Sequence, residues 1–384
     1  MSERGPGEGT AVVERSAEEV RAYARRKYLL FAGHLLVGAA FLTAMIAGGS
    51  DIVGREARAI AGDKALLSAV FFYFAGFSLA YLLVTLPLTF YREYVLERMF
   101  DLSTQTLPGW ARRRLKKWLI SFVIAAPLVL AFYWMLRRWP THWWVPASAT
   151  WVLVSYVLTK FAPQVLIPVF YKMEPIQDEQ LVAALSGLAE RAGIQLAAVC
   201  RIDLSRETRK ANAAVVGLGS TRRVVLGDTL LEKFTRAEIQ VVFAHELGHI
   251  VHRHLLKGFL WGGLIAVASL YAAGLVLGRA AALLHHQPHD PETLPVLVAL
   301  VGAILFLVMP FERWYSRARE LESDRYALRA TGLRGPFISA MKKLGRMNLA
   351  DVKPGKLAEI FLFSHPPISR RIRLAETIDL GPAE

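Results

Sequence analysis

Cysteine is almost absent from this chain: its 384 residues include one, Cys200. A single cysteine excludes an internal disulfide. Cys200 lies within Ala-Ala-Val-Cys-Arg-Ile, a setting typical of a buried strand residue, so we expect no catalytic thiol. A cleavable signal peptide is also not indicated, because the polar residues 1–27 precede an apolar run that is too long and has no small-residue cleavage site after it.

Charge is scarce over long stretches of the chain. Hydrophobic residues make up 54% of it, and its mean hydropathy is positive. Six runs reach the length of about 20 residues that a spanning helix needs and carry almost no charge. They are Tyr28–Gly49, Leu66–Tyr91, Trp118–Leu136, Trp143–Tyr171, Leu255–Leu277 and Leu294–Phe311. The sequence therefore predicts a mainly α-helical polytopic membrane protein of about six spans, with a small α+β part outside the membrane.

Acidic residues are outnumbered, since 32 Asp and Glu face 46 Lys and Arg for a net charge of +14. Such an excess can indicate nucleic-acid binding, but its placement here follows membrane topology. Lys and Arg concentrate before the first span, at Arg25–Lys27, and between the second and third spans, in 92–117. Short loops rich in Lys and Arg stay in the cytoplasm. We therefore expect a lipid bilayer and no nucleic acid as partner, with the N-terminus, residues 172–254 and the C-terminus on the cytoplasmic side.

The expected spans divide the chain into five parts. They are a cytoplasmic tail (1–27), a four-span bundle with a basic loop (28–171, loop 92–117), an α+β part (172–254), a two-span hairpin (255–311) and a C-terminal part (312–384). In the α+β part, a helix is expected over Asp178–Ala192, followed by short strands within 196–204, 211–219 and 222–231 and a turn at 217–220. Thr235 and Glu238 form a capping box, so another helix should begin at Arg236.

That last helix would carry Phe243–His254, a stretch with four histidines and one glutamate. Its core reads H-E-x-x-H at His245, Glu246 and His249. On a helix, His245 and His249 project from one face and can hold one ion. Glu246 lies one residue round, where it can accept a proton from the attacking water. The alternative is a polar helix face at a membrane boundary.

A catalytic zinc site usually has a third protein ligand. The helical pattern of Glu312–Gly332 offers Glu312, Glu320, Glu322 and Asp324, and position alone does not choose among them. Glu320 and Asp324 are four residues apart on one face, so one can bind the metal while the other accepts a hydrogen bond from a ligand histidine. The alternative is an ordinary charged helix with Arg–Glu pairs.

Taken together, these motifs resemble the membrane-embedded zinc metalloproteases of the CAAX prenyl protease type 1 family. H-E-L-G-H at His245–His249 is followed by S-R-x-x-E-x-x-x-D at Ser316–Asp324. Further stretches resemble the family's basic loop, active-site strands and C-terminal His-Pro motif, in the family's order. They are "VLERMFDLSTQTLPGW", "FAPQVLIPVFYKMEP", "ANAAVVG", "RRVVLGDTLL" and "FSHPPISRRI". The similarity covers about Arg92–Arg373.

The resemblance implies a gluzincin-type zinc metalloendopeptidase with one Zn²⁺ per chain. The implied ligands are His245, His249 and Glu320, with Glu246 as catalytic base and Asp324 as hydrogen-bond partner of a ligand. The implied activity is hydrolysis of peptide bonds at the cytoplasmic membrane boundary, such as removal of the C-terminal tripeptide of prenylated proteins.

Three further residues take their roles from the resemblance alone. Asn212 and His365 are implied to lie beside the metal and to donate hydrogen bonds to the peptide backbone or the developing oxyanion. The strand around Asn212 is implied to pair with the substrate as an added strand. Arg371 is implied to steady the same site.

The chain also departs from the family's pattern. Larger members have seven spans, whereas six are expected here. Ser323 stands where Ala is common, and Ala214 where an aromatic residue often follows Asn-Ala. The composition, rich in Ala, Arg, Gly and Leu, favours a bacterial source and hence the inner membrane. Farnesylated substrates are not expected there, so the need for prenylation stays open.

Three other functions remain open from the sequence. The first is a heat-shock-type quality-control metalloprotease that cuts unfolded membrane proteins. The second is an intramembrane site-2-type protease, which is disfavoured because Gln240, Arg253 and Lys257 flank the motif. The third is a membrane transporter or scaffold with a vestigial site. The complete set of His245, Glu246, His249 and Glu320 disfavours it.

Other histidines are expected to have no part in the site. We expect His252 and His254 to be polar residues at the membrane interface. His285, His286 and His289 are expected in a solvated loop. His34 lies within the first span, where an ionisable residue is a functional candidate unless it reaches water at the end of the span.

Overall fold

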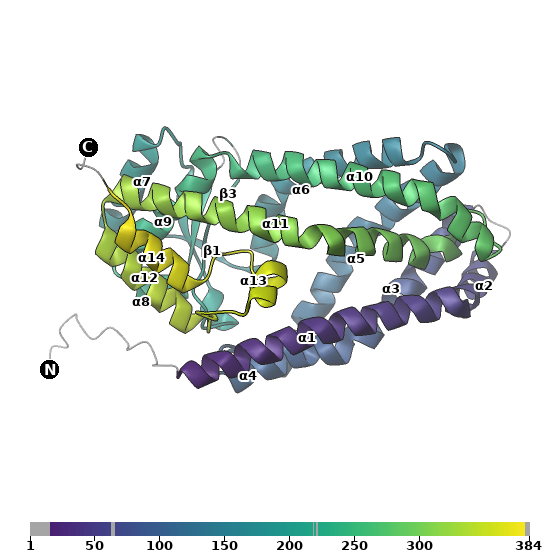
Figure 1. Ribbon diagram of the computed structural model, residues 1–384, viewed down its shortest axis with the longest axis horizontal. Coiled ribbons are helices and arrows are strands. Elements are labelled where there is room, and N and C mark those ends of the chain that lie inside the picture. The colour runs from purple at the N-terminus through teal and green to yellow at the C-terminus, as the bar shows by residue number, and fades with distance from the viewer. Residues whose placement is uncertain (1–15, 63–65, 218, 220–221, 381–384) are drawn as a thin grey trace.

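The computed structural model describes residues 16–62, 66–217, 219 and 222–380. Six long helices run lengthwise through the molecule, and a small sheet with several short helices lies at one end (Figure 1). The long helices are α1 (Ala17–Ala44), α3 (Leu66–Phe90), α5 (Leu107–Arg138), α6 (Trp144–Phe170), α10 (His254–Leu283) and α11 (Leu294–Thr331). The start of α1 and the end of α14 (Ile368–Thr377) both lie at the end that carries the sheet.

Five stretches of the described chain are long and apolar enough to cross a membrane. They are Ala17–Ala61, Leu66–Met99, Leu107–Arg138, His254–Leu283 and Pro291–Thr331. Each contains one of the expected apolar runs. The remaining expected run corresponds to α6, which packs against α10. The prediction of a mainly α-helical polytopic membrane protein is thus confirmed.

The helices continue well beyond the apolar runs. α1 begins at Ala17 behind a capping box made by Ser16 and Glu19, so the polar lead-in and the first span are one helix. α5 begins at Leu107, so much of the expected basic loop is helical. α11 has 38 residues and joins the sixth span to the acidic segment after it. At 1.5 Å per residue this is about 57 Å, far more than the hydrocarbon core of about 30 Å.

The end of α1 departs from the expected loop. A π-helical turn, η1 (Met45–Gly49), contains Gly48 at φ 133°, which is a conformation that favours glycine. The chain then continues as α2 (Ser50–Ala61), which packs against α3 at the end of the molecule away from the sheet (Figure 1). Arg55 and Arg58 therefore lie on a helix, whereas the sequence placed them in a loop.

The sheet has four short strands in the order β1-β2-β4-β3. They are β1 (Met173–Pro175), β2 (Ala198–Ile202), β3 (Ala213–Val216) and β4 (Arg223–Gly227). β2 and β4 are parallel, and the other pairs are antiparallel. The expected strand over 222–231 is too long, because residues 228–233 form helix α8 (Asp228–Lys233). The expected turn at 217–220 lies partly outside the described residues.

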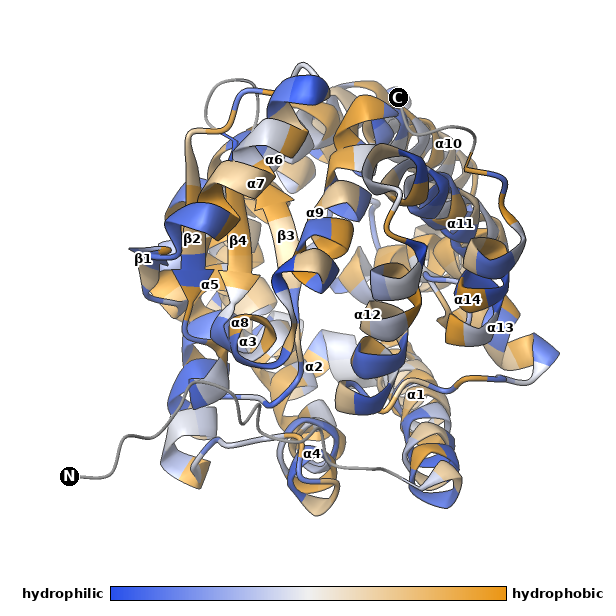
Figure 2. Ribbon diagram, turned by 90° about the vertical axis from the view of Figure 1, so that its left-hand side faces the viewer, coloured by the Kyte–Doolittle hydropathy of each residue, from blue (hydrophilic) through white to orange (hydrophobic). Residues whose placement is uncertain are grey.

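The edge strand β3 lies beside α9 (Arg236–Val251), as the end-on view shows (Figure 2). The predicted capping box is confirmed: Thr235 accepts from the Glu238 N–H, and Glu238 accepts from the Thr235 N–H. α9 packs on α7 (Glu179–Arg191), α11 and α12 (Arg334–Met347). Phe243 and Leu247 are fully buried in this core, and each contributes about 1.5–3 kcal/mol by its burial.

Gly248 explains how closely α9 and α11 approach each other. A Cβ at Gly248 would lie 2.9 Å from the Cα of Ser323, so no larger residue fits without separating the helices. Ser323 is itself fully buried, in a place where only a small side chain fits. This contact sets the spacing between the histidines of α9 and the carboxylates of α11.

Candidate metal centre

Three side chains converge where α9 meets α11. The Nε2 atoms of His245 and His249 are 3.3 Å apart, and they lie 3.3 Å and 3.4 Å from the two carboxylate oxygens of Glu320. In a tetrahedral zinc site with ligands at about 2.0–2.1 Å, neighbouring ligand atoms are about 3.3–3.4 Å apart. Glu320 Oε2 is buried and accepts no hydrogen bond from the described residues. The three side chains therefore fit one zinc-sized ion.

His245 is held from behind by a charged pair. Its Nδ1 lies 2.9 Å from Asp324 Oδ1, and Arg371 donates to both oxygens of Asp324, at 2.8 Å and 2.5 Å. Asp324 is fully buried and Arg371 is nearly so. When Nε2 of His245 faces the metal, Nδ1 carries the proton that Asp324 accepts. Asp324 thus orients the ring, and Arg371 orients Asp324.

His249 is held in the same way by a residue that the sequence analysis placed elsewhere. His254 Nδ1 lies 3.0 Å from His249 Nδ1, and His254 Nε2 lies 2.8 Å from Glu322 Oε2. When Nε2 of His249 binds a metal, its Nδ1–H donates to His254, which in turn donates to Glu322. The expectation that His254 is an interfacial polar residue is wrong, since only 4% of it is exposed.

Glu246 has the surroundings of a general base. Burial raises the pKa of its carboxyl above the usual range, although the positive charge of His245 and a hydrogen bond from the Val215 N–H act in the opposite direction. A raised carboxyl pKa brings the group closer to neutral pH, which favours proton transfer. Glu246 and Glu320 line the same cavity as His245.

The two ligand histidines differ in charge before a metal binds. Although burial opposes it, the adjacent carboxylates of Asp324 and Glu320 raise the pKa of His245 to about 9. Burial, with the positive charge of His245, lowers the pKa of His249 to about 4. A metal that binds at neutral pH must therefore displace one proton, from His245.

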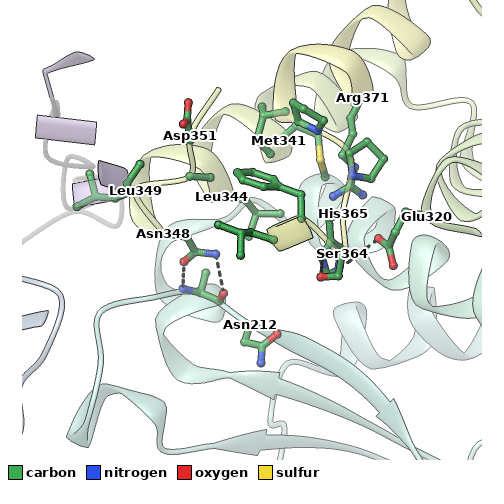
Figure 3. Close-up of a pocket in the computed structure, with 18 of the residues that line it drawn as sticks. Asn212, Glu320, Met341, Leu344, Asn348, Leu349, Asp351, Ser364, His365 and Arg371 are labelled. Carbon is green, nitrogen blue, oxygen red and sulfur yellow. Dashed lines mark hydrogen bonds and ion pairs between the residues drawn. The ribbon is translucent and has the colours of Figure 1, made fainter. Parts of the chain in front are cut away.

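His365 lies beside Glu320, whereas Asn212 lies further off, at the start of β3 (Figure 3). His365 precedes α14, and its Nε2 lies 3.4 Å from Glu320 Oε2. Asn212 stands just before β3 and lines the cavity. Its neighbour Ala211 is bracketed by Asn348, which accepts from the Ala211 N–H at 3.1 Å and donates to its carbonyl at 3.4 Å. Asn348 thus fixes the start of the edge strand, a role that the sequence did not indicate.

Two cavities meet at the site. The first, of about 650 Å³, extends from His245 and Glu320 past Asn212 to α1. The second, of about 690 Å³, extends from His249 past Val215 to α6 and α10. Glu246 and Glu320 line both, so the metal position lies between them.

The remaining histidines lie apart from the three ligands. His34 Nδ1 donates to the Leu30 carbonyl, 2.8 Å away, and the residue lines the far part of the first cavity. His252 is partly exposed and pairs with Glu322 at 3.3 Å. His286 lies in the segment joining α10 to α11 and contacts Asp51 at 2.9 Å. Cys200 is buried in β2, as expected of a structural residue.

Comparison with known families agrees with this arrangement. Residues 175–379 match peptidase family M48, and residues 9–172 match the CAAX prenyl protease N-terminal region, described as five membrane helices. Within that N-terminal region the described chain has four long helices and the shorter α2 and α4 (Leu96–Met99).

Individual relatives extend the match over nearly the whole chain. The protein named uncharacterized metalloprotease YhfN of Bacillus subtilis is 31% identical over 362 residues, which cover 93% of this chain and 84% of the relative. CAAX prenyl protease 1 of Saccharomyces cerevisiae is 26% identical over 313 residues, covering 76% and 68%.

A solved structure shares the fold. The crystal structure of S. mikatae Ste24p superposes with a TM-score of 0.86 at 20% identity, covering 97% of this chain and 91% of that one. The two family matches cover residues 9–172 and 175–379, which include the membrane helices and the His-His-Glu centre of this chain. This chain is therefore an integral membrane metalloprotease of peptidase family M48, related to the CAAX prenyl proteases.

Proposed function

We propose that the protein is a zinc-dependent endopeptidase that cuts near the C-terminus of membrane-associated proteins at the cytoplasmic membrane boundary. The observation that carries this proposal is the triangle of His245, His249 and Glu320, whose edges of 3.3–3.4 Å fit a tetrahedral zinc. Glu246 beside that triangle supplies the base that hydrolysis needs.

Each residue of the site has a distinct task in peptide hydrolysis. Zinc, when bound, supplies a Lewis acid that favours ionisation of water and polarises a carbonyl. Glu246 accepts a proton from the attacking water and passes it to the leaving amine. His365 and Asn212 donate hydrogen bonds to the substrate carbonyl or backbone, where fixed donors favour the charge that develops during attack. Asp324 and His254 keep the two ligand rings in place.

The substrate is proposed to bind as an added strand on β3. β3 is the edge of the sheet, and its free side faces α9 and the site. An edge strand offers unpaired N–H and C=O groups that a peptide in extended form can use, and on β3 the Val215 N–H is not among them because it donates to Glu246. Such a peptide passes through both cavities and brings one of its bonds beside Glu246.

The substrate class follows from the relatives and the location. Several relatives are named CAAX prenyl protease 1, which favours removal of a C-terminal tripeptide from a lipid-anchored protein. The second cavity opens between α6 and α10, two helices of the membrane bundle, where a lipid-anchored chain would approach. The excess of Lys and Arg at Arg25–Lys27 and in 92–117 favours a cytoplasmic location for the site, in a bacterial inner membrane.

Cleavage of a defined peptide tests the proposal. Detergent-purified full-length protein is incubated with a C-terminal CAAX peptide, either farnesylated or unmodified, and the products are identified by mass spectrometry. We expect release of the C-terminal tripeptide, with the farnesylated peptide preferred. Glu246→Ala should keep its metal and lose cleavage by a factor of at least about 100, because the variant lacks the carboxylate that accepts the proton from the attacking water.

The possible outcomes separate the rival functions. Equal cleavage of both peptides would favour a quality-control peptidase and would contradict the predicted preference for the farnesylated peptide. Full activity of Glu246→Ala would contradict the mechanism. Cleavage of neither peptide by a zinc-loaded protein would contradict the proposed substrate class.

A further inference from the structure

The first cavity contains more positive than negative charge at the end away from the metal. Lys27 of α1 and Arg92 of η2 (Tyr91–Val95) line it, together with the metal-site residues. Lys210 lies close by: its Nζ is 3.1 Å from the Tyr23 hydroxyl and 5.6 Å from the centre of the Tyr23 ring. Lys27 Nζ is 5.1 Å from the centre of the same ring.

The nearby carboxylates are already occupied. Glu97 accepts from Tyr23 at 2.6 Å and pairs with Lys210 at 2.6 Å. Glu93 lies 3.1 Å from Arg92 and 3.8 Å from Arg114.

Lys27 remains without a carboxylate partner. Among the described residues, no carboxylate oxygen lies within 4.0 Å of its Nζ. Asp351, the other acidic residue at this end, accepts from Tyr28 at 2.9 Å. Lys27 therefore has charge available for an anion, and Arg92, which contacts Glu93 through Nη2, has further N–H groups that can donate to it.

The position of β3 indicates what that anion is. Asn212 and Ala213, at the start of β3, line the first cavity, whereas Val215 and Gly217, at its end, line the second. A peptide antiparallel to β3 therefore runs from the second cavity to the first and directs its C-terminus towards α1. A parallel peptide would bring a positively charged N-terminus to Lys27 instead, which like charges disfavour.

The spacing fits a short leaving peptide. Lys210 precedes Asn212 by two residues, which in an extended chain is about 7 Å. A peptide that is cut beside Glu246 and passes Asn212 in extended form thus reaches the cationic end about two residues beyond Asn212. At that distance its terminal carboxylate lies within reach of the flexible Lys27 and Arg92 side chains.

We propose that Lys27 and Arg92 bind the C-terminal carboxylate of the substrate and make the enzyme selective for a free C-terminus. This inference rests on the proposed function, since it assigns a role to the C-terminal end of the same bound peptide. An anion that bridges Lys27 and Arg92 gains charge-assisted hydrogen bonds, and a neutral carboxamide does not. An internal segment of a protein would have no group to offer there.

Binding can be measured without cleavage. Full-length zinc-loaded Glu246→Gln protein in neutral detergent is titrated with a fluorescent CAAX-type peptide that ends in a free carboxylate, and with the same peptide ending in a carboxamide. We expect the acid to bind at least about tenfold more tightly, the effect of one charge-assisted contact. The preference should weaken as salt rises, because screening reduces the attraction.

Variants in the same background assign the preference to this site. Lys27→Gln and the double variant Lys27→Gln/Arg92→Gln should bring the ratio of acid to amide affinity towards one, and Lys27→Arg should keep it. Lys117→Gln is the matched control. Lys117 lines a neighbouring crevice with Lys27 and Arg92 but does not line the first cavity, so its loss should leave the ratio unchanged.

Several results would overturn the inference. Equal affinity for acid and amide in the parent protein would do so, and so would a preference that survives the double variant. Binding of neither peptide would show that the cavity holds no C-terminus. If an anionic phospholipid displaced acid and amide alike, Lys27 and Arg92 would be assigned to a lipid headgroup. This measurement records binding to an inactive variant. If the wild-type protein fails to cut CAAX peptides, the proposed function is contradicted, but the comparison of acid and amide binding can still be made.

Discussion

Each candidate ligand histidine makes a hydrogen bond through Nδ1, the ring nitrogen that faces away from the proposed metal position. His245 donates to the carboxylate of Asp324, and His249 donates to the neutral ring of His254. A carboxylate partner makes the ring a stronger electron donor than a neutral partner does. The two ligands are therefore not equivalent, and His245 should contribute more to metal affinity.

Replacing Asp324 tests that difference. Asp324→Asn keeps the shape and a hydrogen-bond acceptor but removes the charge that His245 and Arg371 both contact. We expect zinc affinity to fall by about 10- to 100-fold, as is typical when such a partner is lost. The zinc affinity of each variant is measured by competition with a chromophoric chelator. Asp351→Asn, in the same cavity but away from the ligands, is the control, and an equal loss there would contradict the assignment.

The sequence could predict some of these residues and not others. His245 and His249 follow from helical spacing, because four residues return a side chain to the same face. Glu320 and Asp324 share that periodicity, but the choice of Glu320 over Glu312 or Glu322 came from the family resemblance. His254 was missed because Arg253 adopts a left-handed conformation at φ 54°, which ends α9 and turns His254 back towards His249. No residue type at that position signals such a turn.

At the scale of elements, α9 is fixed at both ends. Its start is held by Glu238, which accepts from the Thr235 N–H, from Ser339 at 2.6 Å and from Lys343 at 2.7 Å. These contacts tie α9 to α12. The other end meets α11 at Gly248.

Glu238→Gln should lower the free energy of unfolding and leave the side chains of the metal site in place. Burial alone would raise the pKa of Glu238, but the hydrogen bonds from Lys343, Ser339 and Thr235 hold it below the usual range. A lowered pKa means that the stabilisation is present above the unfolded value of about 4.3 and is lost as pH falls through the folded value. We expect a loss of about 1–3 kcal/mol at pH 7, because Lys343 loses its partner.

Thermal unfolding in detergent measures this effect. The midpoint of the Gln variant should lie below that of the wild type at pH 7, and the gap should narrow as pH drops below about 4. Glu232→Gln, an exposed glutamate of α8, is the control and should leave the midpoint unchanged. A gap that widened at low pH would contradict the account of Glu238.

Element boundaries were harder to predict than element types. Apolar runs mark where side chains favour lipid, but helical hydrogen bonds continue into polar residues that are also good helix formers. α5 and α11 therefore extend past their apolar runs. The start of α8 was missed because "DTLL" continues the apolar pattern of β4. The Asp228 carboxylate accepts from the Ser205 and Thr229 N–H groups there and so favours a turn into a helix.

At the scale of the whole molecule, the site joins the membrane bundle to the part that carries the sheet. α9 belongs to the α+β part, whereas α11 continues from a membrane helix, and α10 connects them in sequence (Figure 1). A metal bound by both α9 and α11 closes a long loop that contains a membrane hairpin. Metal binding should therefore stabilise the native state, by a free energy that grows with the logarithm of the free metal concentration divided by Kd.

The central claim is that His245, His249 and Glu320 together hold one zinc ion. The zinc content per chain, measured by plasma mass spectrometry on detergent-purified wild type and Glu320→Ala, tests it most directly. We expect about one zinc per wild-type chain, and little zinc with a lower unfolding midpoint in Glu320→Ala, because two histidines alone bind zinc weakly. A normal zinc content in Glu320→Ala would contradict the claim and would transfer the third ligand to another carboxylate of α11.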